Sequence, residues 1–207
     1  MIFQKTTVSH PRTHQPHLYN PEPKEWSVIN NIDWLKPIIV DVGCGKGAWV
    51  VSEAKKNPNQ TYIGIERTLN KSKMLLQSVS EAKLANLIGV RADAVALIHQ
   101  KFPKASVSEL HFFYPNPTPK RSQANKRFFV SGHFQVFHEA LKTEGLISLV
   151  TNIYEYADEA RAFLHTVWGY QVKSLNVVNK TIEPRTDFEK KYLEMGQAVY
   201  ELIAEKQ

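Results

Sequence analysis

The sequence predicts a doubly wound α/β fold with a mostly parallel, Rossmann-like sheet of seven strands that includes a C-terminal antiparallel strand. The first sign is an apolar run at residues 38–42 that leads into a glycine-studded loop and then a helical pattern. Strand-like and helix-like patterns alternate as far as residue 167, as in parallel sheets joined by crossover helices. Two strand-like stretches at 170–178 and 197–204 follow without a long helix between them, so we expect an antiparallel closing hairpin.

The first five strands are short runs rich in β-branched, aromatic and leucine residues. They are expected at residues 38–42, 61–65, 87–91, 110–114 and 146–151. Helices are expected from residue 48, at 69–84, around 95–102, at 126–142 and at 154–167, where apolar residues recur at helical spacing. Pro115 is expected to end the fourth strand, because proline has no N–H to donate to a sheet.

Residues 1–30 differ in composition from the rest of the chain. They are rich in proline, show no periodicity, and contain His10, His14 and His17. This composition predicts a mobile or wrapping N-terminal arm, followed by a single domain over residues 31–207. The three histidines have no spacing that fixes a coordination geometry, so no metal site is predicted.

Composition narrows the class of protein. The 207 residues suffice for one α/β domain, and the net charge of +6 favours a polyanionic partner. Cys44 is the only cysteine, which excludes a disulfide framework and fits a reducing cytoplasm. No apolar run is long enough to cross a bilayer and no signal peptide is visible, so we expect a cytoplasmic protein without a membrane partner. Its expected oligomeric state is a monomer or a homodimer.

The loop after the first strand predicts a cofactor site. Gly43, Gly45 and Ala48 fit the dinucleotide pattern G-x-G-x-x-G/A, and Asp41, Gly43, Gly45 and Gly47 fit the S-adenosylmethionine pattern D/E-x-G-x-G-x-G. Asp41 favours the second pattern, because a carboxylate can pair with a cationic amino-acid group but would repel a pyrophosphate.

Three carboxylates follow successive predicted strands. Asp41, Glu66 and Asp93 each lie where a strand ends, and the carboxyl ends of parallel strands form the edge at which such sheets bind ligands. Glu66 is placed to accept both ribose hydroxyls of a nucleoside, and Asp93 to accept from an adenine amino group. The alternative is that these residues cap the helices that follow them.

Three further motifs carry a family resemblance. The segment from Phe112 to Pro117, followed by Lys120, Arg121, Lys126 and Arg127, resembles the F-F-P-D-P-W-x-K-x-R-H-x-K-R-R signature of bacterial tRNA (guanine-N7-)-methyltransferases. Residues 150–157 resemble the A-T-D-x-x-x-Y-A motif of that family, and residues 185–189 contain its T-x-F-E. The resemblance runs from about Ile39 to the C-terminus with every landmark in order.

The resemblance implies a class I methyltransferase that moves a methyl group from S-adenosylmethionine to N7 of a guanosine in tRNA, at position 46 in the variable loop. It implies that Asn116 is the catalytic residue and also contacts the cofactor, together with Asp41, Gly43, Gly45, Glu66 and Asp93. It assigns substrate binding to Lys120, Asn152, Thr186 and Glu189, and RNA contacts to Arg121, Lys126 and Arg127.

The chain departs from the family pattern on the substrate side. Asn116 and Asn152 stand where the family has aspartate, Thr118 replaces a tryptophan, and an Arg-His pair is missing. These departures leave two alternatives open: a methyltransferase of the same fold with another substrate, and a non-catalytic RNA-binding relative. A nicotinamide-dependent oxidoreductase is the more distant alternative, which the glycine pattern alone would allow.

Overall fold

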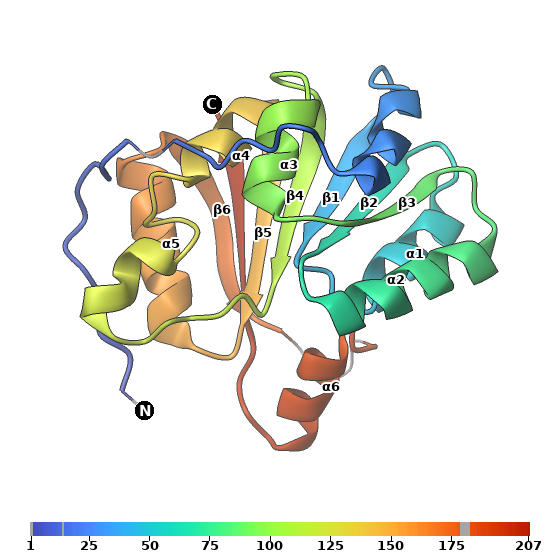
Figure 1. Ribbon diagram of the computed structural model, residues 1–207. Helices are drawn as coiled ribbons and strands as arrows, with labels where there is room; N and C mark the ends of the chain where they lie inside the picture. Colours follow the sequence, from blue (N-terminus) through green and yellow to red (C-terminus); the bar gives the residue numbers. More distant parts are fainter. Residues whose placement is uncertain (1, 14, 179–182) are drawn as a thin grey trace.

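The computed structural model describes residues 2–13, 15–178 and 183–207, which form a layered α/β structure around one seven-stranded sheet (Figure 1). The strand order is β3-β2-β1-β4-β5-β7-β6. The strands are β1 (Ile38–Val42), β2 (Thr61–Glu66), β3 (Leu87–Arg91), β4 (Val107–Phe113), β5 (Leu141–Thr151), β6 (Tyr170–Val177) and β7 (Tyr200–Lys206). Strands β1 to β5 pair in parallel, and β7 is antiparallel to both β5 and β6. The predicted fold class is therefore confirmed.

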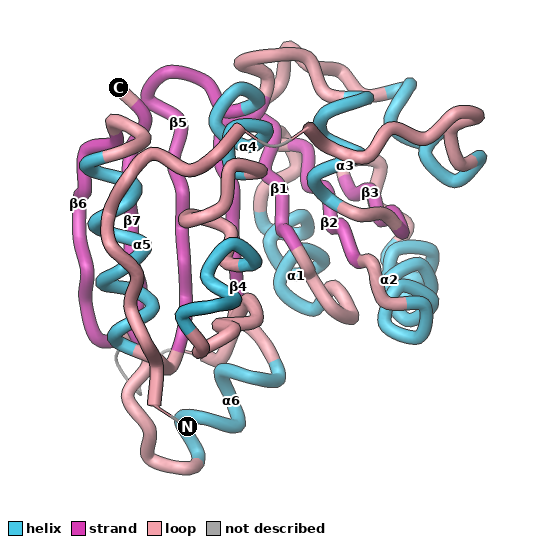
Figure 2. The backbone as a smooth tube through the Cα atoms, turned by 60° about the vertical axis from the view of Figure 1, so that its left-hand side comes forward, coloured by secondary structure: helices cyan, strands magenta, loops and turns pink. Residues whose placement is uncertain are grey.

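Helices cover both faces of the sheet. The α-helices are α1 (Ala48–Lys56), α2 (Leu69–Ala82), α3 (Ala94–Lys101), α4 (Phe134–Ala140), α5 (Tyr154–Thr166) and α6 (Asp187–Glu194), and η1 (Lys24–Asn31) and η2 (Arg121–Lys126) are 3-10 helices. Figures 1 and 2 show α6 beyond the end of the sheet at which β4 and β5 finish, not on either face. None of the described helices combines the length and apolar character that a bilayer crossing requires.

The continuous apolar run of β1 is explained by burial on both faces. All five of its residues are buried, and alternate side chains point to opposite sides of the sheet. Val40 belongs to the large core that includes residues of η1, α3, α4 and α5, whereas Ile39 belongs to a smaller core with residues of α1 and α2. Burial on both faces fixes the strand whose end carries the glycine loop.

The helix predicted at 126–142 is wrong in its extent. Only residues 134–140 form α4, residues 127–133 form turns, and β5 already begins at Leu141. The Ser131 hydroxyl accepts a hydrogen bond from the His133 N–H at 3.2 Å, a local bond that competes with helix formation. Beyond the predicted hairpin strands, the structure adds the short helix α6 between them.

The N-terminal segment lies against the domain. Trp26 and Ile29 of η1 are 2% and 1% exposed within the large core, although they precede the boundary expected at residue 31. Further upstream, the Tyr19 N–H donates to Gln100 on α3, and Lys5 pairs with Asp158 on α5. Figure 1 shows the arm passing outside α5 before it crosses the molecule toward η1. His14 lies outside the described residues.

Candidate cofactor and substrate site

The loop between β1 and α1 has a backbone that requires glycine. Gly43, Gly45 and Gly47 have φ values of 78°, 62° and 81°, in the left-handed region that other residues rarely adopt. A Cβ added at Gly43 or Gly45 would meet no atom within 4 Å, whereas one at Gly47 would lie 2.5 Å from Leu75 Cδ1. Gly47 therefore allows close packing on α2, while Gly43 and Gly45 leave open space beside the loop for a ligand.

Glu66 at the end of β2 holds this loop. Its Oε2 accepts from the Gly45 N–H at 3.0 Å, and its Oε1 accepts from the Thr68 N–H at 2.6 Å. The side chain is nearly buried, yet each carboxylate oxygen can accept a second hydrogen bond. Glu66 can therefore organise the glycine loop and still receive hydroxyl groups of a nucleoside.

Asp41 is a buried carboxylate with one oxygen that lacks a hydrogen-bond partner among the described residues. It is 1% exposed, and its Oδ1 accepts no hydrogen bond from any residue that the structure describes. Burial, and secondarily the nearby charge of Glu66, raise the pKa of Asp41 well above its ordinary value. An unpartnered buried acceptor is costly and calls for a cationic or hydrogen-bonding ligand, which an ammonium group of S-adenosylmethionine can supply.

Asp93 has the capping role that the sequence left open. Its Oδ1 accepts from the N–H groups of Val95 and Ala96 at 3.1 and 3.3 Å, and its Oδ2 lies 3.6 Å from Arg67 Nη1. The carboxylate thus caps the N-terminus of α3, at the same sheet edge as Asp41 and Glu66. Its contact with an adenine amino group stays a prediction.

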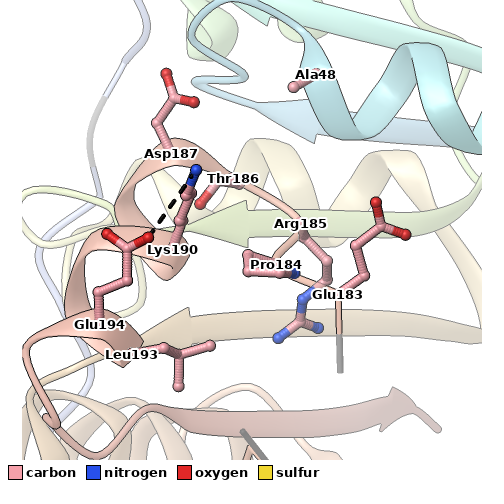
Figure 3. A pocket seen from close by; sticks show the side chains of 9 residues that line it. All are labelled: Ala48, Glu183, Pro184, Arg185, Thr186, Asp187, Lys190, Leu193 and Glu194. Carbon is pink, nitrogen blue, oxygen red and sulfur yellow. Dashed lines mark ion pairs between the residues drawn. The ribbon is translucent and has the colours of Figure 1, made fainter. Parts of the chain in front are cut away.

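The segment before and within α6 encloses space next to the glycine loop. A pocket of about 510 Å³ is lined by Ala48, Glu183, Pro184, Arg185, Thr186, Asp187, Lys190, Leu193 and Glu194. Figure 3 shows Ala48 on α1 and Arg185 and Thr186 on the segment that leads into α6. Lys46 of the glycine loop pairs with Asp187 at 3.0 Å, which ties α6 to the loop. The pocket therefore lies between the first residue of α1 and the segment that carries Thr186.

Aromatic rings stack between the end of β4 and α6. Tyr114, directly after β4, stacks on Tyr192 and Phe188 with ring centroids 5.4 and 6.1 Å apart. Its hydroxyl is buried without a hydrogen-bond partner among the described residues, and burial, followed by the charge of Glu189, raises its pKa. Tyr114 is therefore a neutral phenol whose ring belongs to a preformed stack.

Asn116 and Asn152 lie on the loops that follow the two central strands β4 and β5. Asn116 is exposed, and its Oδ1 accepts from the Thr118 N–H at 3.1 Å, which shapes the turn between two prolines. Asn152 donates from Nδ2 to Gln197 at 3.0 Å. Lys120 is exposed at the start of η2, four residues beyond Asn116. The catalytic and substrate roles of these residues stay predictions.

Thr186 and Glu189 have a structural role that the sequence analysis overlooked. Thr186 Oγ1 accepts from the Glu189 N–H at 3.1 Å, and the buried Glu189 carboxylate is bound by the Arg185 guanidinium at 2.6 Å. The T-x-x-E spacing is a helix-capping signature, which could have revealed this role. Arg185, which also pairs with Glu201 on β7, is thus a site residue that sequence reasoning missed.

The prediction that Arg127 contacts RNA is wrong. Its side chain is 0% exposed, and its Nη1 donates to both oxygens of Glu159 at 2.7 and 2.8 Å. A guanidinium enclosed in this way cannot reach a phosphate. Arg121 and Lys126, in contrast, are exposed and remain available to a nucleic acid. Among the described residues, no group of three or more His, Cys, Asp or Glu side chains could hold a metal ion.

Most of the chain matches a known family of proteins. The family model "Putative methyltransferase" matches residues 35–202. The tRNA (guanine-N(7)-)-methyltransferase of Lactobacillus gasseri is 28% identical in an alignment that covers 97% of this chain and 94% of that protein. The enzyme of the same name from Pectobacterium atrosepticum is 27% identical over 91% of this chain and 79% of its own length.

A solved structure shares the fold at lower sequence identity. The 16S rRNA methyltransferase KamB superimposes with a TM-score of 0.62 over 96% of this chain and 99% of that chain, at 17% identity. At that identity the likeness concerns the fold alone, and it agrees with the sheet described above. Because the family model spans most of the chain, this protein belongs to that methyltransferase family, and the resemblance to tRNA (guanine-N7-)-methyltransferases is confirmed.

Proposed function

We propose that this protein transfers the methyl group of S-adenosylmethionine to N7 of a guanosine in tRNA. The observation that carries the proposal is the glycine loop beside the unpartnered Asp41 carboxylate, within a chain whose relatives are named for this reaction. As a finer proposal, the target is the guanosine at position 46 in the variable loop.

The cofactor side is built from groups with complementary chemistry. Asp41 would hold the ammonium group of S-adenosylmethionine, Glu66 would accept from its ribose hydroxyls, and Asp93 would accept from its adenine amino group. The open space at Gly43 and Gly45 lets the ligand approach the main chain. When bound, S-adenosylmethionine supplies an electrophilic methyl carbon on a sulfonium sulfur.

The substrate side needs no general base. Guanine N7 carries a lone pair and no proton, so the chain has to align N7 with the methyl carbon and exclude water. As N7 forms its new bond to carbon, the bond to sulfur breaks and the purine becomes cationic. Asn116 orients the reactants through its amide but brings no negative charge to this cation, so its contribution is smaller than that of an aspartate.

The RNA side is the exposed basic segment that follows Asn116. Lys120, Arg121 and Lys126 lie on or next to η2, and phosphate contacts by these residues would make binding sensitive to salt. A tRNA substrate and the single free cysteine both suit the cytoplasm. A monomer or a homodimer is the expected oligomeric state.

Methyl transfer from labelled S-adenosylmethionine to bulk tRNA tests this proposal. The expected product is 7-methylguanosine in the nucleoside digest of tRNA from a strain that lacks this modification. A protein that binds S-adenosylmethionine but labels another nucleoside would be a methyltransferase with a different acceptor. One that binds both ligands and labels nothing would be a non-catalytic relative.

A further inference from the structure

The buried guanidinium of Arg127 joins three segments that are distant in the sequence. It pairs with Glu159 on α5. Its N–H groups also donate hydrogen bonds to the loop that follows Asn116 and to the N-terminal arm. Such complete enclosure of an arginine is unusual, because burial of a cation is favourable only when every donor finds an acceptor. This cluster is separate from the pocket beside α6, since none of its residues lines that pocket.

The loop contacts involve consecutive main-chain carbonyls. Arg127 Nε donates to the carbonyls of Pro117 and Thr118 at 3.1 and 3.2 Å. Its Nη2 donates to the carbonyls of Thr118, Pro119 and Lys120 at 3.0, 3.2 and 3.4 Å. One side chain therefore fixes the main chain from the residue after Asn116 as far as Lys120.

The N-terminal arm completes the same cluster. Gln4 accepts from Arg127 Nη2 at 3.0 Å through its carbonyl, and its own N–H donates to the Pro119 carbonyl at 2.9 Å. The Phe3 ring lies 4.2 Å from the Arg127 guanidinium carbon and 5.8 Å from the Tyr156 ring. The Thr6 N–H donates to Glu159 at 2.7 Å, so both members of the buried pair bind the arm.

The arm also contacts the exposed basic segment. The Arg121 N–H donates to Gln4 Oε1 at 3.1 Å, and Arg121 Nη2 donates to Thr7 Oγ1 at 3.2 Å. Gln4 and Thr7 of the arm therefore contact the loop directly at Pro119 and Arg121. A loop with three prolines in five residues, 115–119, forms few hydrogen bonds of its own, so its position depends on these external partners.

We propose that Arg127 is a positioning residue for methyl transfer, and that residues 3–7 of the arm form part of the substrate side of the site. Arg127 and the arm together fix the loop that places Asn116 and Lys120 at the sheet edge. This inference rests on the proposed function for its kinetic consequence, while its structural consequence can be measured without any tRNA.

Arg127→Lys is the first test, because lysine keeps a charge for Glu159 but cannot donate to four loop carbonyls and the arm. Hydrogen exchange of the amides in residues 118–124 should become about tenfold faster, whereas exchange in the glycine loop should stay unchanged. With tRNA, kcat should fall about tenfold or more while the dissociation constant for S-adenosylmethionine stays within about twofold. If kcat, cofactor affinity and melting temperature all fall together, Arg127 has only a structural role.

Phe3→Ala is the second test and remains informative if Arg127→Lys does not fold. Its matched control is Ile2→Ala, because Ile2 is the adjacent arm residue and is 87% exposed. Phe3→Ala should speed loop exchange and lower kcat, and Ile2→Ala should change neither. Equal behaviour of the two variants would overturn the role of the arm. If the wild type methylates no tRNA, the proposed function fails, and hydrogen exchange alone decides whether Arg127 and the arm hold the loop.

Discussion

Asp41→Asn should stabilise the unliganded protein and weaken its binding of S-adenosylmethionine. The Asp41 carboxylate is 1% exposed and its Oδ1 has no partner among the described residues, so its charge opposes folding until a ligand arrives. Asparagine keeps the Oδ1 acceptor but removes the buried charge, a change worth about 1–3 kcal/mol. For a chain of this size that corresponds to a rise in melting temperature of roughly 2–12 °C.

The pH dependence of this gain follows from the direction of the pKa shift. Burial raises the pKa of Asp41 in the folded state above its value in the unfolded state. The neutral carboxyl is therefore tolerated at low pH, and stability is lost as the pH rises through the folded pKa. The advantage of Asp41→Asn should be largest above that pKa and should vanish below the unfolded pKa, which scanning calorimetry over a range of pH can measure.

Cofactor binding should change in the opposite sense. Loss of a charge-assisted contact of about 1–3 kcal/mol would weaken S-adenosylmethionine binding by about 5- to 150-fold. The exposed carboxylate of Glu25 supplies the control, since Glu25→Gln should alter neither stability nor affinity. A folded Asp41→Asn protein with lowered stability and wild-type affinity would refute the assignment of Asp41.

Three further substitutions test the other parts of the site. Glu66→Ala should weaken S-adenosylmethionine binding by about 1–3 kcal/mol, because it removes the acceptor of the Gly45 N–H as well as the predicted ribose contact. Calorimetry measures this loss, and an unchanged affinity would show that Glu66 does not belong to the site. Asn116→Asp should raise the methylation rate about tenfold by placing a charge near the forming cation, and an unchanged or lower rate at every pH would contradict that role. Replacing Lys120 and Lys126 with alanine should weaken tRNA binding and reduce the slope of log affinity against log salt concentration by about 2. The control is Lys36→Ala, at the opposite sheet edge, which should leave that slope unchanged. An unaltered slope in the double variant would place the RNA elsewhere.

The strands and the glycine loop could be predicted because their causes are local. A strand buried on both faces needs a continuous apolar run, so the predicted bounds 38–42 match β1. The loop needs left-handed backbone at Gly43 and Gly45, and glycine is the residue that adopts it freely. In both cases the signal and the structure lie within the same few residues.

The predictions that failed depend on contacts distant in the sequence. Arg127 belongs to a basic run that suggests an exposed face, but its burial depends on Glu159, 32 residues away, and on the arm. The helix predicted at 126–142 failed because the spacing of its phenylalanines does not reveal the competing bond of Ser131 or the early start of β5. Periodicity indicates which side chains are buried, but it does not indicate where the helix that carries them begins and ends.

Methylation of N7 at one tRNA guanosine is tested most directly by one measurement. The measurement uses two tRNA transcripts that differ only at position 46, one with guanosine and one with adenosine. Each is incubated with the protein and S-adenosylmethionine and then treated with borohydride and aniline, which cut the RNA strand at 7-methylguanosine. We expect a cut at position 46 in the guanosine transcript and none in the adenosine transcript. Methyl incorporation without that cut, or no incorporation by a protein that binds S-adenosylmethionine and tRNA, would contradict it.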